Sequence, residues 1–152
     1  MGRKISVLLA DNSEYFAVPC ANGMKAQGLD VMTTEKDGRT VLEAIERYQP
    51  DVVIMDFFLP RLDAIGVMKR MQEKADGQRP LVMIMSGFDN PALEREAMSA
   101  GADYYFLKPF DAEAMAQRIL SRCGEQPAVH AVKTPAPSVA NSNLEIQVTE
   151  II

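Results

Sequence analysis

Short runs of apolar residues recur at intervals as far as about residue 124. Most of these runs are apolar at nearly every position, which is typical of strands that are covered on both faces of a sheet. They predict five strands, at residues 5–10, 29–33, 52–55, 81–85 and 104–107. The strand at residues 29–33 has the weakest pattern of the five.

Between these runs, apolar residues return at the three- and four-residue spacing of amphipathic helices. The spacing predicts helices at residues 13–27, 39–48 and 62–75, from Asn90 to Gly101, and from Asp111 to about Cys123. Pro19 lies inside the first of these segments. Proline lacks the backbone N–H that a helix interior needs, so we expect a kink or a late helix start at that point.

Strands and helices therefore alternate strictly along the chain. This alternation predicts an α/β fold, in which a parallel sheet carries helices on both faces. Five-stranded sheets that are doubly wound in the flavodoxin-like manner have the strand order 2-1-3-4-5, and we expect that order here. In that order the first and third strands are neighbours, at the point where ligands usually bind.

Four of the predicted strands end on polar residues that suit phosphoryl chemistry. The residues are Asp11, Asp56, Ser86 and Lys108, from the first, third, fourth and fifth strands. Because the carboxyl ends of parallel strands share one edge of the sheet, we expect these side chains to converge. Two carboxylates, a hydroxyl and an ammonium together match the needs of a divalent cation and a phosphoryl group.

Within this set, Asp56 is the candidate nucleophile, because a carboxylate can accept a phosphoryl group and form an acyl phosphate. Ser86 could donate to a phosphoryl oxygen, and Lys108 could neutralise its charge. Taken singly, each residue has a plainer interpretation: a turn cap for Asp56, a turn residue for Ser86 and a solvated side chain for Lys108. Their expected convergence favours the phosphoryl interpretation.

A hard cation such as Mg²⁺ takes oxygen ligands and keeps several waters. Asp11 and Asp56 could supply carboxylates, Asn12 its amide oxygen and Phe58 its backbone carbonyl. The alternative for the Asn12-Ser13 pair is to cap the first helix, and Ser13 suits that role whichever interpretation holds.

Composition and charge narrow the class of protein. The formal net charge is −5, so the chain lacks the basic excess of a nucleic-acid-binding protein. The N-terminal apolar run is too short for a signal peptide or a membrane span. Cys20 and Cys123 have no CxxC spacing, so no disulfide framework is implied and a reducing compartment fits. We expect a cytoplasmic protein that makes no contact with a membrane.

The composition changes after residue 124. Residues 1–124 are expected to form one domain, and residues 125–143, rich in Pro, Ala, Ser, Thr and Val, an extended linker. Residues 144–152 are again rich in apolar residues. We expect them to begin a truncated C-terminal effector domain, and the alternative is an appended strand or tail that packs on the first domain.

Four segments together resemble the receiver domain of two-component response regulators over residues 5–124: LLADN, DVVIMDFFLPRLDAIG, MIMSGF and GADYYFLKPFD. The resemblance implies that Asp56 accepts a phosphoryl group from a phosphohistidine on a sensor histidine kinase or a phosphotransfer protein. It also implies a Mg²⁺ site at Asp11, Asp56 and the Phe58 carbonyl. The domain would be a signalling switch rather than an enzyme, with only self-catalysed phosphoryl transfer and slow autodephosphorylation.

The same resemblance gives Ser86 and Lys108 the hydroxyl and lysine roles, makes Tyr105 the switch aromatic and implies a cis Lys108–Pro109 bond. Phosphorylation would alter the face formed by the fourth helix, fifth strand and fifth helix, and would drive homodimerisation. The segment GADYYFLKPFDAEAM, the linker and the final NLEIQVTEII are further similar to transcription factors that control endospore formation. This similarity implies DNA binding only through a C-terminal domain that is absent from this chain.

One position departs from the family pattern. Receivers usually carry two adjacent acids after the first strand, and here the pair is Asp11-Asn12. With one carboxylate fewer, we expect poor Mg²⁺ affinity, restored in Asn12→Asp. The alternative function is therefore a receiver-like protein-interaction module with weak or no phosphorylation.

Three other classes of protein lack their motifs here. A dehalogenase-type phosphatase needs an acid two residues after the nucleophilic aspartate, where this chain has Phe58. A flavodoxin needs a Ser/Thr/Gly-rich phosphate loop after the first strand, where this chain has DNSEYF. A dinucleotide enzyme needs GxGxxG at the same place, and that motif is absent.

Overall fold

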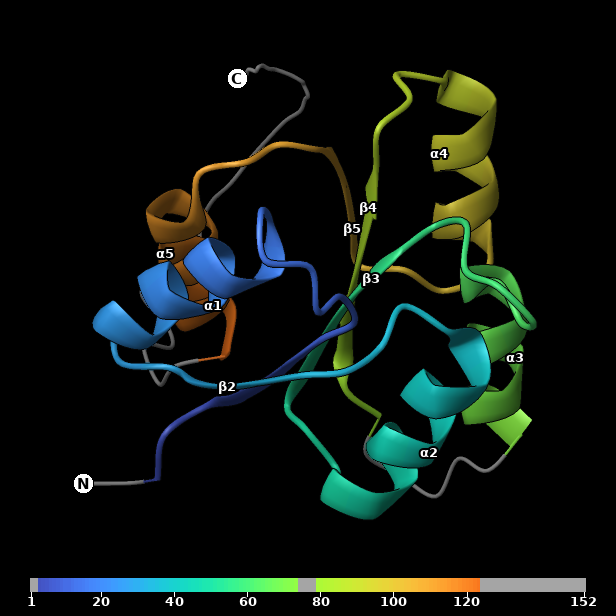
Figure 1. Ribbon diagram of the computed structural model, residues 1–152. Coiled ribbons are helices and arrows are strands. Elements are labelled where there is room, and N and C mark those ends of the chain that lie inside the picture. The colour runs from blue at the N-terminus through green and yellow to red at the C-terminus, as the bar shows by residue number, and fades with distance from the viewer. Residues whose placement is uncertain (1–2, 74–78, 124–152) are drawn as a thin grey trace. The chain divides into compact units, whose positions relative to one another are not determined.

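The computed structural model describes residues 3–73 and 79–123. Residues 1–119 form one compact unit. Within the described residues, the strands are β1 (Ser6–Leu9), β2 (Asp30–Thr33), β3 (Val52–Asp56), β4 (Leu81–Ser86) and β5 (Tyr104–Leu107). The helices are α1 (Ala17–Ala26), α2 (Gly38–Tyr48), α3 (Ala64–Glu73), α4 (Pro91–Ser99) and α5 (Ala112–Cys123) (Figure 1).

The strands form one parallel sheet in the order β2-β1-β3-β4-β5, which confirms the predicted flavodoxin-like fold. The central strand β3 is buried along its whole length. It is held in register on both sides, with Val52 opposite Val7 of β1 and opposite Leu81 of β4. Because every strand runs in the same direction, the carboxyl ends of all of them lie at one edge of the sheet.

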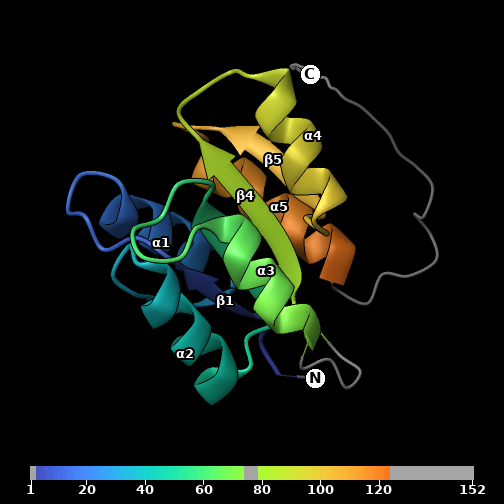
Figure 2. The ribbon, with the colours of Figure 1, turned by 90° about the vertical axis from the view of Figure 1, so that its right-hand side faces the viewer.

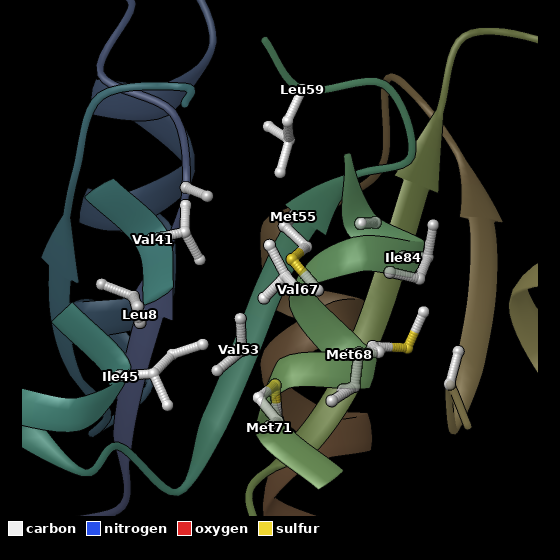
Figure 3. Close-up of a cluster of buried hydrophobic side chains, with 14 of the residues drawn as sticks. Leu8, Val41, Ile45, Val53, Met55, Leu59, Val67, Met68, Met71 and Ile84 are labelled. Carbon is white, nitrogen blue, oxygen red and sulfur yellow. The ribbon is translucent and has the colours of Figure 1, made fainter. Parts of the chain in front are cut away.

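Helices cover both faces of this sheet. α1 and α5 lie on one face, and α2, α3 and α4 lie on the other (Figures 1 and 2). Side chains alternate between the faces along each strand, and Val53 and Met55 of β3 point into the core on the second face (Figure 3). Burying side chains of this size contributes about 1.5–3 kcal/mol each, so the strand that ends on Asp56 is firmly placed.

Helix α1 begins late, at Ala17, so the late start anticipated at Pro19 is confirmed. Pro19 falls in the first turn of the helix, where a backbone N–H has no intrahelical acceptor and its loss costs little. Ahead of the helix, the Ser13 hydroxyl oxygen accepts hydrogen bonds from the backbone N–H groups of Phe16 and Ala17, each at 3.3 Å. Ser13 therefore stabilises the turn that leads into α1, whereas the N-cap residue of the helix itself is Phe16, which makes no side-chain cap hydrogen bond.

Two loops at the carboxyl edge are clamped together. The Asp37 carboxylate caps α2 by accepting from the Arg39 and Thr40 backbone N–H groups, and its other oxygen accepts from Arg61 Nε at 2.7 Å. The Gly38 backbone N–H donates to the Pro60 carbonyl at 3.1 Å. The β2–α2 loop is therefore fastened to the loop that follows Asp56.

Several sequence-based expectations lie outside the described residues. They are the end of the helix predicted at residues 62–75, the linker at residues 125–143 and the segment at residues 144–152. The domain boundary at residue 124 stays a prediction for the same reason. In the described part of the chain, no helix has the length and apolar character needed to cross a bilayer.

An ion-pair cluster joins the amino ends of β1 and β3, at the opposite end of the strands from the carboxyl edge of the sheet. The Asp51 carboxylate accepts from both terminal nitrogens of Arg3, at 2.7 and 2.9 Å, and from the Ser6 backbone N–H at 2.8 Å. The hydrogen bond from Arg3, followed by that from Ser6, lowers the pKa of Asp51 from 3.8 to about 2, against the opposing effect of burial.

Asp51→Asn is expected to lower the free energy of unfolding at pH 7 by about 1 kcal/mol, allowing for solvent screening of the exposed Arg3 partner. Because the pKa of Asp51 is depressed in the folded state, its contribution is complete above about pH 4 and is lost as the pH falls towards 2. Urea unfolding at several pH values should show the two proteins converging in acid. Asp30→Asn, at an exposed position of β2, serves as the control, and a constant difference between wild type and Asp51→Asn would contradict the assignment.

Candidate functional site

Each polar residue predicted at the functional edge stands where its strand ends. Asp56 is the last residue of β3 and Ser86 the last of β4, while Lys108 directly follows β5. The register of β1 on β3, continued two residues past Leu9, brings Asp11 level with Asp56. Asp11 and Asp56 are only 3% and 7% exposed, so both carboxylates need charged or hydrogen-bonding partners.

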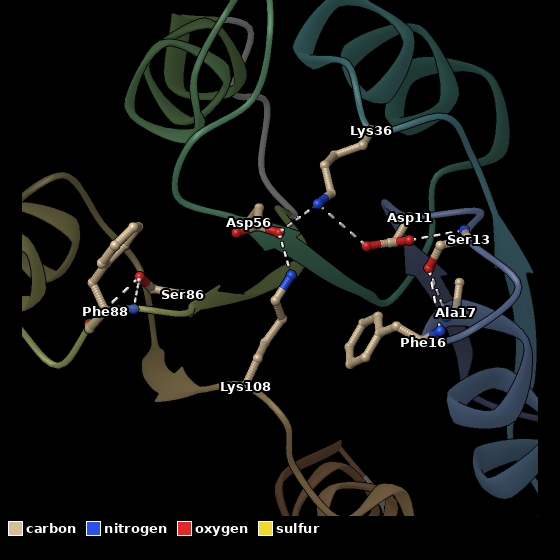
Figure 4. Close-up of polar contacts among 9 residues, drawn as sticks. All are labelled: Asp11, Ser13, Phe16, Ala17, Lys36, Asp56, Ser86, Phe88 and Lys108. Carbon is tan, nitrogen blue, oxygen red and sulfur yellow. Dashed lines mark hydrogen bonds and ion pairs between the residues drawn. The ribbon is translucent and has the colours of Figure 1, made fainter.

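Lys108 is the first such partner. Its Nζ donates to Asp56 Oδ2 at 2.8 Å, and three-quarters or more of its side chain is covered (Figure 4). The same ammonium lies 5.0 Å from the centre of the Phe16 ring, close enough for a cation–π contact. The Lys108–Pro109 bond is cis, as the resemblance to receivers implied. A fixed positive charge therefore lies directly beside the candidate nucleophile.

Lys36 is the second partner, and sequence reasoning did not single it out. It extends from the β2–α2 loop, and its Nζ lies 3.3 Å from Asp56 Oδ2 and 3.6 Å from Asp11 Oδ2 (Figure 4). Burial favours the neutral amine, but the carboxylates of Asp56 and Asp11 outweigh it and hold the pKa of Lys36 above its ordinary value. The ammonium thus bridges the two acids.

The remaining oxygen of Asp11 is also engaged. Asp11 Oδ1 accepts from the Ser13 backbone N–H at 2.9 Å, which ties the acid to the turn that leads into α1. Asn12, between them, is exposed. Among residues 3–73 and 79–123, no three His, Cys, Asp or Glu side chains converge to hold a metal ion. The acids in contact with Lys36 and Lys108 are therefore Asp11 and Asp56.

Ser86 and Tyr105 lie on the β4–α4 side of the edge. The Ser86 hydroxyl oxygen accepts from the Phe88 backbone N–H at 3.0 Å, so it is engaged with its own loop. The Tyr105 hydroxyl donates to the Phe88 carbonyl at 3.2 Å. Burial raises the pKa of Tyr105, and the negative charges of nearby carboxylates add to that effect. Both hydroxyls thus converge on Phe88 rather than on Asp56.

The residue that was expected to offer a carbonyl, Phe58, directs its ring outward. The ring is about half exposed and makes edge-on contacts with Phe57 and Phe88, at 4.9 and 6.0 Å between ring centres. These aromatic contacts join the loop after β3 to the loop after β4. Any movement of Phe88 would therefore also displace the ring of Phe58, which lies in the segment that directly follows Asp56.

The oxygen atoms at this edge can be compared with the ligands that a divalent cation prefers. Mg²⁺ binds through one or two carboxylates and keeps several waters, so the carboxylates of Asp11 and Asp56 suit this ion. Both of these acids already hold a cationic group between them, which shows that their oxygens face a common point. Asp11 and Asp56 are therefore the residues that would hold the ion.

Comparison with known proteins fits this geometry. The family model of the response regulator receiver domain matches residues 7–120, and the chain belongs to that family. Receiver domains are signalling domains rather than classical enzymes, and they interact with histidine kinases or phosphotransfer proteins. The assignment places this chain in two-component signalling.

Solved structures share the fold. The signal receiver domain of the response regulator NarL from Mycobacterium tuberculosis is 23% identical, with a TM-score of 0.71 over 80% of this chain and 97% of that one. The receiver domain of the Francisella response regulator 1452 is 27% identical, with a TM-score of 0.67 over 76% of this chain and 93% of that one. The chemotaxis response regulator CheY4 of Vibrio cholerae is 22% identical, with a TM-score of 0.68 over 79% and 98%.

Proposed function

We propose that this receiver domain accepts a phosphoryl group on Asp56 from a phosphohistidine of a sensor histidine kinase or a phosphotransfer protein. The observation that carries the proposal is the Asp56 carboxylate at the carboxyl end of β3, with Lys108 Nζ at 2.8 Å from its Oδ2. A carboxylate oxygen forms the new O–P bond, while the N–P bond of the phosphohistidine breaks and the imidazole keeps the electron pair. The product is an acyl phosphate on Asp56.

Charge stabilisation is the main need of such a transfer. Lys108 is positioned to neutralise an oxygen of the phosphoryl group as that group arrives. Asp11 and Asp56, together with the Asn12 amide oxygen and the Phe58 backbone carbonyl, would hold Mg²⁺, which when bound supplies further positive charge to the phosphoryl oxygens. Ser86, at the end of the neighbouring strand, would leave its contact with Phe88 to donate to the same group, and Tyr105 would act as the switch aromatic.

Downstream, we propose control of transcription. Phosphorylation would change the face of α4, β5 and α5 and promote a homodimer in the cytoplasm. The resemblance of residues 101–115 and 143–152 to the stage-zero sporulation regulator supports a role in the control of sporulation. DNA would then be bound through a C-terminal domain that follows the linker.

A second candidate function is a receiver-like interaction module that is phosphorylated weakly or not at all. Two observations favour it: Asn12 stands where receivers usually have a second acid, and Lys36 already neutralises Asp11 and Asp56. In that case the surface of the domain, rather than its phosphorylation, would carry the signal.

Incubation with Mg²⁺ and a small phosphodonor separates the two functions. Acetyl phosphate and phosphoramidate, which has the N–P bond of a phosphohistidine, should each add one phosphoryl group by intact mass. Asp56→Asn should abolish the gain, whereas Asp89→Asn, an exposed carboxylate of the β4–α4 loop, should retain it. A folded wild-type protein that gains no mass from either donor would exclude the phosphoacceptor and leave the interaction module.

A further inference from the structure

We propose that Lys36 is a tethered cation at the acidic site, so that Mg²⁺ binds only by displacing the Lys36 ammonium from between Asp11 and Asp56. The inference concerns the metal that the proposed function uses, and it rests on that function for its importance. It makes Lys36 a regulatory residue of the metal site. The resting receiver is then the lysine-bound form, and the metal-bound form has to compete with it.

The geometry of the ammonium supports this assignment. Lys36 Nζ lies within 3.6 Å of one oxygen from each acid, and those acids come from different strands, β1 and β3. Both carboxylates are almost completely buried, whereas 41% of the Lys36 side chain is exposed. The lysine therefore reaches inward from the surface to a point that two buried acids share.

The loop that carries Lys36 is held in place rather than free to drift. Its next residue, Asp37, caps α2 and pairs with Arg61, and Gly38 is hydrogen-bonded to Pro60. These contacts fix the backbone next to Lys36 within reach of Asp56. The side chain itself is a flexible four-carbon stem, so the ammonium can withdraw to solvent without disturbing the clamp.

Competition follows from the shared ligand atoms. Asp56 Oδ2 receives Lys36 and Lys108, and Asp11 Oδ2 receives Lys36. A divalent cation needs carboxylate oxygens at this same place, and it would be repelled by an ammonium that stayed within a few ångströms. Asn12 offers a neutral amide at a position where a second acid would strengthen metal binding. Its presence therefore favours the Lys36 ammonium over Mg²⁺ in the competition for the two carboxylates.

Mg²⁺ affinity measured by isothermal titration calorimetry tests the inference. Lys36→Gln keeps a long polar side chain and removes the charge, and it is expected to bind Mg²⁺ about tenfold more tightly than wild type, or about 1.4 kcal/mol. Lys25→Gln, an exposed lysine in the last turn of α1, is the matched control and should bind as wild type does. Equal or weaker binding by Lys36→Gln would overturn the proposal.

A second measurement needs no variant of Lys36. The side-chain NMR signals of Lys36 in the wild-type protein should move as Mg²⁺ is added, in parallel with the backbone signals of Asp11 and Asp56. Signals of Lys36 that stay unchanged while the metal binds would show that the ammonium is not displaced, and would refute the inference even if Lys36→Gln failed to fold.

Asn12→Asp provides an independent route to tighter binding, because it adds a carboxylate instead of removing an ammonium. The double variant Lys36→Gln/Asn12→Asp should bind more tightly than either single variant. These titrations contain no phosphodonor, so they are separable from the proposed function. Tighter Mg²⁺ binding by Lys36→Gln, in a protein that is not phosphorylated on Asp56, would keep the inference and reject the function. Phosphorylation of Asp56, together with an unchanged Mg²⁺ affinity in Lys36→Gln, would keep the proposed function and reject the inference.

Discussion

Lys108→Ala is expected to slow phosphorylation of Asp56 by about 100- to 1,000-fold, the range seen when one preorganised charge-stabilising donor is removed. The physical reason is the 2.8 Å contact between Lys108 Nζ and Asp56 Oδ2 at the edge of a buried strand. An incoming phosphoryl group carries about −1.5 to −2 charges. Without Lys108, the ammonium nearest to the nucleophile would be Lys36, which is shared with Asp11.

The rate can be followed by intact mass during incubation with acetyl phosphate and Mg²⁺. Lys25→Ala removes an exposed lysine of α1 and should react as wild type does. Thermal unfolding of each variant by circular dichroism shows whether the fold is retained. A folded Lys108→Ala protein that reacts within about threefold of wild type would mean that Lys108 does not stabilise the arriving charge.

Gly38→Ala is expected to lower the free energy of unfolding by about 3 kcal/mol or more, at the upper end of the range for overpacked sites. A Cβ atom at residue 38 would overlap the carbonyl oxygen of Leu62, and would also press on the Leu62 carbonyl carbon and Cβ. The obstructing atoms are largely backbone, so no side-chain rotation relieves the clash. The β2–α2 loop and the loop before α3 would have to separate, which would break the hydrogen bond from Gly38 to Pro60.

Gly87→Ala is the matched control. A Cβ atom at residue 87 would meet no atom within 4 Å, so this substitution should change the free energy of unfolding by less than about 1 kcal/mol. Urea unfolding of the three proteins gives the comparison. Gly38→Ala with the stability of Gly87→Ala would show that the two loops at the functional edge approach each other less closely than described.

The strands were predictable because their sequences are continuous runs of apolar residues. Runs such as residues 52–55 and 81–85 are apolar at every position, and short runs of this kind are typical of strands covered on both faces of a sheet. The predicted strands agree with β1 to β5 to within a residue at each end. Helix starts were harder to predict, because the first turn of α1 depends on Ser13 and Pro19 rather than on apolar spacing.

At the site, strand ends could be placed from the sequence but side-chain contacts could not. Asp56 and Lys108 meet as their positions after β3 and β5 suggested. Ser86 turns to Phe88, a local backbone contact that no spacing rule anticipates. The chemical roles of these residues stay predictions that the phosphorylation experiments address.

Lys36 is not evident from the sequence because it follows β2, whose apolar pattern is the weakest of the five strands. The signal was present all the same: Lys36 follows the carboxyl end of a parallel strand, as Asp11, Asp56 and Lys108 do. An edge strand can deliver a long side chain across to its neighbours, so residues after edge strands belong in the search for a site.

The pairing of two acids with two lysines has a consequence for the domain as a whole. The formal charges of Asp11, Asp56, Lys36 and Lys108 add up to zero, although two buried like charges alone would be costly to fold around. The charges of the four side chains therefore cancel before any ion binds from the medium. A chelator should therefore leave such a domain folded, because its two acids are neutralised by lysines of the same chain.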